Sequence, residues 1–305
     1  MNDTATIRLL RVEDIPRILA IAHHAGWTQT EADLERMIRY APDGSFGLDA
    51  HPYPSETDSA DAILTSTAMA FRHGPELGWI AMVLTDPMYR GHGFASKLME
   101  HAIEHLRTLG TAWIKLDASD LGRPIYERMG FATENLMERR LRPPGDSASV
   151  LHAALPEVIE GDVLPLTLDR KAFGADRSRL LGMLSGLHGA RTALLSGGRG
   201  YAILRHGKRG RQLGPMVCTD EPGAEALVRW AIGQSGDHTL QWDLIRENEP
   251  ARLLADHYGF ETHRVLNRMA LKGTAVEGTA LDKVSTQQFS GCNDLVYSIA
   301  GFDFG

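Results

Sequence analysis

The sequence predicts an α/β protein made of two similar domains in tandem, each a mixed, mostly antiparallel sheet flanked by helices. Three observations support this class. The length of 305 residues exceeds that of a usual single domain, strand-like and helix-like patterns alternate along the chain, and segments of the first half recur in the second half. The 43% hydrophobic and 23% charged fractions are those of an ordinary soluble globular protein.

The first half begins with a strand, two helices and three strands. IRLL reads as the first strand, and Asp14 and Pro16 mark the start of a helix through ILAIAHHAGW. EADLERMIRYA repeats apolar residues at helical spacing. Three strands follow, and the last of them is apolar on both faces, as expected of a central strand: FGLDA, AILTSTAMAF and LGWIAMVLT.

The first half then continues as helix, strand, helix and strand. The helix ends at Gly110, before the strand AWIKLD. Its apolar face consists of Ala95, Leu98, Ala102 and Leu106. A short helix runs from Pro124 to Gly130 and leads into the strand FATENLMERRL. The expected order is therefore βααβββαβαβ.

A linker separates the two predicted domains, because RPPGDSAS at 142–149 combines proline, glycine and serine. We expect the first domain at 1–142, the linker at 143–155, the second domain at 156–272 and a tail at 273–305. In the tail, LVYSIAGFDFG alternates like a strand. This alternation predicts that the tail returns to pair with one of the sheets.

An internal repeat indicates that the second domain duplicates the first. The segment GPMVCTDEPGAEALVRWAI resembles the earlier segment DPMYRGHGFASKLMEHAI in its proline, its methionine and its apolar helix positions. A shared spacing across helix and turn favours duplication over chance. Pro87 and Met88 recur as Pro215 and Met216. Ala95 recurs as Ala224 and Phe131 as Phe260, and these two pairs share a spacing of 129 residues.

Charge and cysteine usage exclude several classes of protein. The net charge of -7 argues against a general nucleic-acid binder, and the basic stretch RHGKRGR is interpreted as a hairpin turn. Cys218, Cys292 and the pair His23-His24 do not form a metal-ligand pattern, so no metal is expected. We find no signal peptide and no apolar run long enough for a membrane span, which predicts a cytoplasmic protein without a membrane partner.

The stretch DPMYRGHGFASKLM places a glycine-rich turn between a buried strand and a helix. The first N–H groups of a helix lack intrahelical partners and the helix dipole favours negative charge, so this turn predicts a phosphate-binding site. Gly91-His92-Gly93 also resembles the start of a dinucleotide-binding fingerprint, but its third position is Ser96. Nucleotide binding through this turn therefore stays the third hypothesis.

The same stretch resembles motif A of the GNAT superfamily of acyl-CoA-dependent N-acetyltransferases, at positions 90–95. IYERMGF resembles the later Tyr-x-x-x-Gly-Phe element of this family, IRLLRVEDIPRI resembles its usual opening, and the predicted order of elements is the GNAT order. The resemblance covers about 7–141. AGWTQTEADLERM and LDASDLGRPIYERMGF resemble a bacterial subgroup with two GNAT domains in one chain.

The resemblance implies a site for the co-substrate acetyl-CoA. Backbone N–H groups of the turn would hold the CoA pyrophosphate, and the end of the preceding strand would run beside the pantetheine arm. Ser119 stands where the family often has Asn and could replace part of that contact. The implied cofactor-binding residues are Val83, Leu84, Thr85, Arg90, Gly91, His92, Gly93, Phe94, Ala95 and Ser119.

The resemblance also implies the catalytic groups. Tyr126 stands at the position of the general acid that protonates the CoA thiolate, or is a packed helix aromatic. An N–H near Leu84 could stabilise the oxyanion. Asp117 is the first choice as general base, although it could instead cap the following turn. Trp27 and Gln29 lie in the loop that lines the acceptor site in this superfamily, where the tryptophan would belong either to the substrate wall or to the core. Weaker candidates for the base are Glu31, Asp33 and His73.

The second domain is expected to be GNAT-like in fold but unable to bind CoA. The run at 218–222 replaces the Arg-Gly motif and contains Asp220 and Glu221, which would repel a pyrophosphate, and Ala255 stands in the place of Tyr126. This domain would complete the acceptor pocket, stabilise the first domain or support a homodimer. Arg177 and Arg179 in FGADRSRL would reach an anionic acceptor group, or else belong to a solvated helix face.

The leading hypothesis is an acetyl-CoA-dependent N-acetyltransferase that transfers an acetyl group to a primary amine of a small molecule by direct attack in a ternary complex. The alternative is a non-catalytic acyl-CoA-binding sensor or scaffold. The expected partners are a small-molecule amine acceptor and a second copy of the chain, with no nucleic acid.

Overall fold

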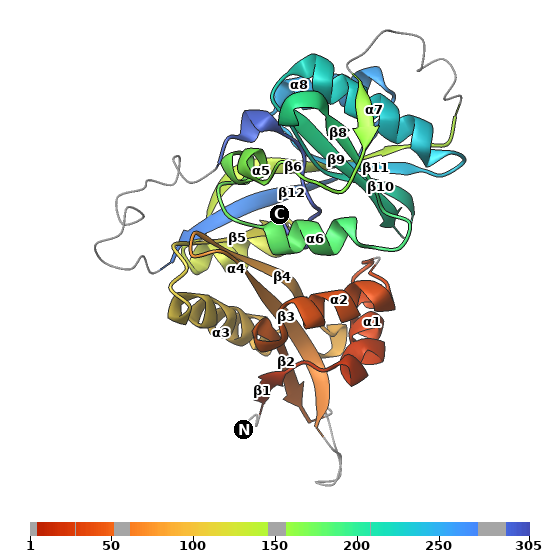
Figure 1. The fold of residues 1–305 in the computed structure, drawn as a ribbon. Coiled ribbons are helices and arrows are strands. Elements are labelled where there is room, and N and C mark those ends of the chain that lie inside the picture. Colours follow the sequence, from red (N-terminus) through yellow and green to blue (C-terminus); the bar gives the residue numbers. More distant parts are fainter. Residues whose placement is uncertain (1–4, 28, 52–61, 146–156, 208, 274–290) are drawn as a thin grey trace. The chain divides into compact units, whose positions relative to one another are not determined.

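The computed structural model describes residues 5–27, 29–51, 62–145, 157–207, 209–273 and 291–305 (Figure 1). It contains the predicted succession βααβββαβαβ twice, which confirms the mixed α/β class and the duplication. The predicted linker extends beyond the described residues, as does much of the tail. No helix in these described ranges is long and apolar enough to cross a bilayer.

The first copy of the succession follows the sequence prediction element by element. Its members are β1 (Thr6–Leu9), α1 (Ile15–His24), α2 (Glu31–Tyr40), β2 (Ser45–Ala50), β3 (Ile63–His73), β4 (Leu77–Thr85), α3 (Phe94–Thr108), β5 (Trp113–Ala118), α4 (Arg123–Arg128) and β6 (Ala132–Arg142).

The second copy repeats the order, and a short strand follows it in the tail. Its members are β7 (Val158–Glu160), α5 (Leu166–Phe173), α6 (Ser178–Ser185), β8 (Arg191–Leu195), β9 (Gly200–Gly207), β10 (Gly210–Cys218), α7 (Glu221–Ser235), β11 (Leu240–Ile245), α8 (Glu249–His257) and β12 (Glu261–Lys272), and the strand of the tail is β13 (Val296–Ser298).

The chain divides into two compact units. Unit 1 consists of Met1–Lys115 with Lys272–Asp282, and unit 2 of Leu116–Leu271 with Lys283–Gly305. In unit 1 the strand order is β1-β2-β3-β4 followed by the first three residues of β5, and all pairs are antiparallel except the parallel pair of β4 with β5. The apolar side of α3 packs on β2, β3 and β4, and Figure 1 shows α1 and α2 on the opposite side of these strands.

In unit 2 the strand order is β12-β6-β11-β10-β9-β8-β7, with β13 paired to β10. All neighbours in this order are antiparallel except β10 and β11. Strand β6, expected to close the first domain, thus lies between two strands of the second copy. The sequence boundaries of the two domains therefore stay a prediction, because the spatial units do not follow them.

The repeat is visible in the buried faces of the two long helices. Every buried position of α3 has a buried counterpart in α7, 129 residues later, from Phe94 and Gly223 to Leu106 and Ser235. The equivalence of Pro87 and Met88 with Pro215 and Met216 was wrong. The first pair lies in a turn beyond β4, whereas the second pair lies inside β10.

Candidate functional site

The turn between β4 and α3 is anchored by a buried aspartate. Asp86 accepts a hydrogen bond from the Met88 N–H (2.9 Å) and so caps the short helix η3 (Pro87–Tyr89). Its other carboxylate oxygen forms an ion pair with Arg17 of α1 (2.6 Å). Arg17 also donates to the Leu64 carbonyl (2.9 Å), so that α1, β3 and the turn are held together. Arg17 was not predicted from the sequence, since nothing local connects it to a residue 69 positions away.

The two glycines of the turn both adopt left-handed backbone conformations. Gly91 has φ 85° and Gly93 has φ 76°, values that cost a residue with a side chain roughly 1–2 kcal/mol. A Cβ placed on either glycine would meet no atom within 4 Å, so the space beside both is open. Glycine is therefore required here by the backbone conformation, and it also leaves room for a ligand to approach.

The N-terminus of α3 has no side-chain cap. Its first intrahelical hydrogen bond runs from the Lys97 N–H to the Gly93 carbonyl (3.0 Å), so the N–H groups before Lys97 are not used within the helix. His92 is turned back toward the carbonyls of Tyr89 and Arg90, at 3.2 and 3.1 Å from its Nδ1 atom. Arg90 and the three following residues are exposed. This arrangement suits a phosphate group.

Strand β4 is irregular next to this turn. Met82 has φ 53°, and the stretch from Ala81 to Leu84 lies opposite the shorter stretch from Thr67 to Met69, which defines a β-bulge. The Thr67 hydroxyl donates to the Met82 carbonyl (2.7 Å) and fixes the bulge. No sequence signal marks this feature, because Met is not a residue that favours positive φ.

The bulge coincides with the end of the pairing between β4 and β5. In the described chain this parallel ladder runs from Leu77 opposite Trp113 to Trp79 opposite Lys115. The residues predicted to contact the pantetheine arm come after it and pair with β3 through Leu84 and Thr85. Val83 and Thr85 are half-buried, and Leu84 is buried. The structure thus gathers the predicted residues 83–85 and 90–95 into one strand, turn and helix.

Asp117, Ser119 and Tyr126 belong to unit 2. The Asp117 carboxylate has no exposed area and forms a bidentate ion pair with Arg268 of β12, with distances of 2.9 and 3.0 Å. A carboxylate in such a pair can accept a proton only in competition with the guanidinium, so the role of Asp117 as general base stays a prediction. Sequence reasoning missed Arg268, which is 151 residues away.

Ser119 begins the turn that leads into α4. Its hydroxyl accepts from the Gly122 N–H (3.3 Å), and its carbonyl accepts from the Arg123 N–H (2.9 Å). The hydroxyl therefore has a local role, and its contact with CoA stays a prediction. Tyr126 follows on α4, with its ring 6.1 Å from that of Phe131. Desolvation by burial raises the pKa of Tyr126 to about 12, which keeps its phenol protonated at neutral pH.

The candidate acceptor residues follow α1. The Trp27 N–H donates to the Ala22 carbonyl (2.9 Å) as the chain leaves the helix, and Trp27 and Gln29 are both half-buried. Asp33 has a structural role, since it accepts from the N–H and the hydroxyl of Thr30 at 2.8 and 2.7 Å in a capping box. His73 is buried beside Tyr40, with 3.5 Å between its Nδ1 atom and the Tyr40 hydroxyl.

The corresponding turn of the second copy is shorter and carries its own anion. β10 ends at Cys218 and α7 begins at Glu221. Asp220 caps α7 by accepting from the Gly223 N–H (2.9 Å), and it also pairs with Arg199 (3.0 Å). A Cβ on Gly223 would lie within 3.0 Å of three side-chain atoms. A carboxylate thus occupies the helix N-terminus that is open in the first copy.

The gap beside β10 is filled as well. The ladder between β10 and β11 ends at Leu213, and β13 then pairs with β10. Ser298 of β13 donates to the carbonyls of Leu213 (2.9 Å) and Asp243 (3.1 Å), so that it bonds to both strands. The Trp242 indole donates to the Tyr297 carbonyl (2.7 Å). The tail thus supplies the returning strand that its alternation suggested, although the sequence did not show which strands it joins.

Arg177 is not available to an acceptor molecule, and neither of the two interpretations of this residue was right. Its guanidinium is 1% exposed and forms an ion pair with Asp169 (2.8 Å), which is 2% exposed. The Tyr201 hydroxyl donates to the same carboxylate. A lone buried charge would be costly, and this network compensates it.

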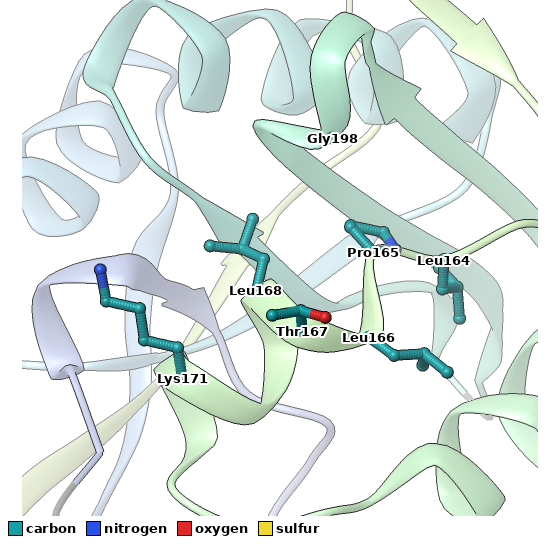
Figure 2. Close-up of a pocket in the computed structure, with 7 residues that line it drawn as sticks. All are labelled: Leu164, Pro165, Leu166, Thr167, Leu168, Lys171 and Gly198. Atoms are coloured by element: carbon teal, nitrogen blue, oxygen red, sulfur yellow. The ribbon is translucent and has the colours of Figure 1, made fainter.

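Unit 2 also contains a pocket away from the predicted site residues. A shallow hollow of about 680 Å³ opens at the start of α5, and none of the predicted site residues lines it (Figure 2). Its lining consists of Leu164, Pro165, Leu166, Thr167, Leu168, Lys171 and Gly198. In the part of the chain that the structure describes, His, Cys, Asp and Glu side chains form no group of three that could hold a metal.

Family models match both copies. The model described as Acetyltransferase (GNAT) family matches residues 19–131, and the one described as Acetyltransferase (GNAT) domain matches residues 166–282. The glucosamine 6-phosphate N-acetyltransferase of Trypanosoma brucei brucei is 37% identical over 71 residues, 23% of this chain and 46% of that protein. The chain thus spans less than half the length of this curated relative. The uncharacterized N-acetyltransferase YhbS of Escherichia coli is 29% identical over 162 residues, 50% of this chain and 91% of that protein.

Solved structures share the fold. A Pyrococcus horikoshii protein named as an acetyltransferase superposes with a TM-score of 0.79 at 20% identity, covering 99% of this chain and 96% of that one. A tandem GNAT protein from the clavulanic acid biosynthesis pathway has a TM-score of 0.61 at 13% identity, covering 88% of this chain and 98% of that one. These likenesses confirm the tandem GNAT fold predicted from the motif and the repeat.

Proposed function

Because the chain belongs to the GNAT acetyltransferase family, we propose that it transfers the acetyl group of acetyl-CoA to a primary amine of a small molecule, by direct attack while both substrates are bound. The observation that supports this most is the turn before α3. There, Gly91 and Gly93 leave uncapped helix N–H groups exposed beside open space. Such a cradle fits a pyrophosphate. A Cβ at either glycine would crowd this group.

The first copy offers backbone groups for the rest of the cofactor. The N–H groups of 91–95 would hold the pyrophosphate, and β4 beyond its bulge would pair with the amide groups of the pantetheine arm. An N–H near Leu84 is suited to the carbonyl oxygen of the thioester, which gains negative charge as the amine attacks. Because these donors are fixed by the bulge and the turn, they need little rearrangement during the reaction.

Two proton transfers complete the reaction. The bond from the amine nitrogen to the acetyl carbon forms as the carbon–sulfur bond breaks, and the sulfur leaves as a thiolate. Tyr126 is the proposed donor of a proton to this sulfur, since its raised pKa keeps the phenol protonated. The amine must lose a proton to a base, directly or through water. Asp117 remains our first candidate, with Arg268 setting its orientation.

We also propose that only the first copy binds acetyl-CoA. In the second copy, Asp220 takes the place of the phosphate at the helix N-terminus, and β13 fills the gap between β10 and β11. The expected stoichiometry is therefore one CoA per chain. Calorimetry that measured two CoA per chain would refute this part of the proposal.

A thiol-release assay over a panel of small amines, amino acids and polyamines tests the activity. We expect free CoA to form in the presence of at least one amine, and Tyr126→Phe to lower kcat by about 10²–10⁴-fold. If acetyl-CoA bound but no free CoA formed with any amine, the protein would instead be an acyl-CoA sensor or scaffold. If NADH or ATP displaced CoA from the turn, nucleotide binding would replace both hypotheses.

A further inference from the structure

An arginine pair on unit 2 is unexplained by the fold. Arg264 of β12 lies directly opposite Arg139 of β6 in their antiparallel ladder. Like charges in this arrangement destabilise a sheet. A β-bulge between Thr262 and Arg264 creates the pairing, because an unbroken register from Thr262 opposite Arg140 would place His263 opposite Arg139. The chain therefore departs from regular pairing in a way that brings two guanidiniums together.

The two arginines differ in what they bind. Arg139 donates to both oxygens of Asp243 (2.8 and 2.7 Å), and its guanidinium lies 4.3 Å from the centre of the Phe302 ring. Arg264 is half-buried and, among the described residues, its side chain has no hydrogen-bond or ion-pair partner. Partial burial of a guanidinium without a protein partner costs free energy.

The charges around Arg264 balance one another, so that its own positive charge has no counterion. Burial lowers the pKa of Arg264, and so do the charges of Arg139 and Arg209, against the opposing effect of Asp303 and Asp243. The Asp243 carboxylate is already engaged by Arg139. Arg209 also contacts the ring of His263, beside Arg264. Three guanidiniums thus face two carboxylates, which leaves one positive charge for a further anion.

We propose that Arg264, with Arg139 beside it, binds the phosphate or carboxylate group of an anionic acceptor molecule. The anion site itself follows from the charges and the bulge, whereas its assignment to the acceptor rests on the proposed function. The geometry of β12 supports the assignment: Arg268, which holds Asp117, lies four residues further along the same face. That spacing is about 13 Å along a strand. The acceptor would then carry its anionic group at the far end from its amine.

Calorimetry with inorganic phosphate tests the anion site without any need for catalysis. We expect Arg264→Gln to weaken phosphate binding by about 10- to 100-fold, because a charge-assisted contact is lost, and Arg264→Lys to restore part of it. The control is Arg252→Gln, which makes the same charge change on α8, where Arg252 pairs with Glu249 and Asp256. Equal phosphate binding by wild type, Arg264→Gln and Arg252→Gln would overturn the proposal.

Thermal denaturation separates a binding role from a structural one. Because Arg264→Gln removes a like-charge contact, we expect its melting temperature to equal or exceed that of the wild type. A clear fall would show that Arg264 stabilises the fold and would count against the site.

Kinetics and CoA binding then identify the source of the anion. With amines that support CoA release, Arg264→Gln should raise the KM of anionic acceptors about 10- to 100-fold and leave neutral amines unchanged. If it weakened CoA binding instead, the anion would belong to CoA, and the assignment to the acceptor would be wrong. If no amine were acetylated while Arg264→Gln still lost phosphate binding, the proposed function would fail and the anion site would stand.

Discussion

Substitution of Gly93 by glutamate separates a binding site from a merely strained turn. At φ 76° any side chain costs about 1–2 kcal/mol of stability, and nothing within 4 Å of the new Cβ adds to this. Gly259 is a matched control, because it has φ 73° and equally open surroundings after α8. Gly93→Glu and Gly259→Glu should therefore lose similar stability in urea denaturation, while only the first introduces a carboxylate into the proposed pyrophosphate cradle.

The expected loss of CoA affinity follows from Coulomb's law. A carboxylate about 5 Å from one phosphate charge, at an effective dielectric constant of about 20, is repelled by about 3 kcal/mol, which corresponds to a factor of about 100 in Kd. Calorimetry with CoA should show this loss for Gly93→Glu and wild-type affinity for Gly259→Glu. If the two variants bound CoA equally well, the turn before α3 would not be the phosphate site.

Three further predictions concern other parts of the chain. The pKa of Tyr126 is raised above its unfolded value of about 10, so the contribution of this tyrosine to stability is present below pH 10 and is lost as the pH rises toward 12. We therefore expect kcat to show no loss from tyrosine ionisation at about pH 10. A midpoint near pH 10 in the profile of kcat would contradict this. Asp169→Asn leaves Arg177 buried without a counterion and should cost about 3–5 kcal/mol in urea unfolding, against less than about 1 kcal/mol for the exposed Glu160→Gln, and equal costs would refute the argument. Asp220→Gly removes the cap of α7 but leaves β13 in place, so no second CoA should bind, and the appearance of a second site by calorimetry would show that Asp220 alone blocks it.

The sequence predicted the parts of the site that depend on backbone conformation. Gly91 and Gly93 were recognised because a glycine-rich turn before a helix suits a phosphate, and the structure shows that both also adopt positive φ. The order of elements was also predictable, since each helix and strand carries its own periodicity of apolar residues. These features are local, and a single stretch of sequence contains the information that specifies them.

Contacts between distant residues were beyond such reasoning. The ion pairs from Arg17 to Asp86 and from Arg268 to Asp117 join positions 69 and 151 residues apart, and no pattern within either segment indicates the partner. The bulge at Met82 was also missed, because its conformation is imposed by pairing with β3 and not by residue type. Pro215 misled the alignment of the two copies because a proline can occupy a bulge as well as a turn.

The two copies show how one fold can keep a site open or close it with its own chain. In the first copy, a helix N-terminus without a cap and a strand that leaves its neighbour after three residue pairs present free backbone groups. In the second copy, the same two places are taken by Asp220 and by β13, which are respectively an anion and an extended peptide. Asp220 places a negative charge at the helix N-terminus, and β13 places amide groups beside the strand. Among the described residues, the open copy has neither of these groups. The closed copy therefore supports, from within the same molecule, the proposal that the open copy binds a ligand with a phosphate end and an extended amide-bearing arm.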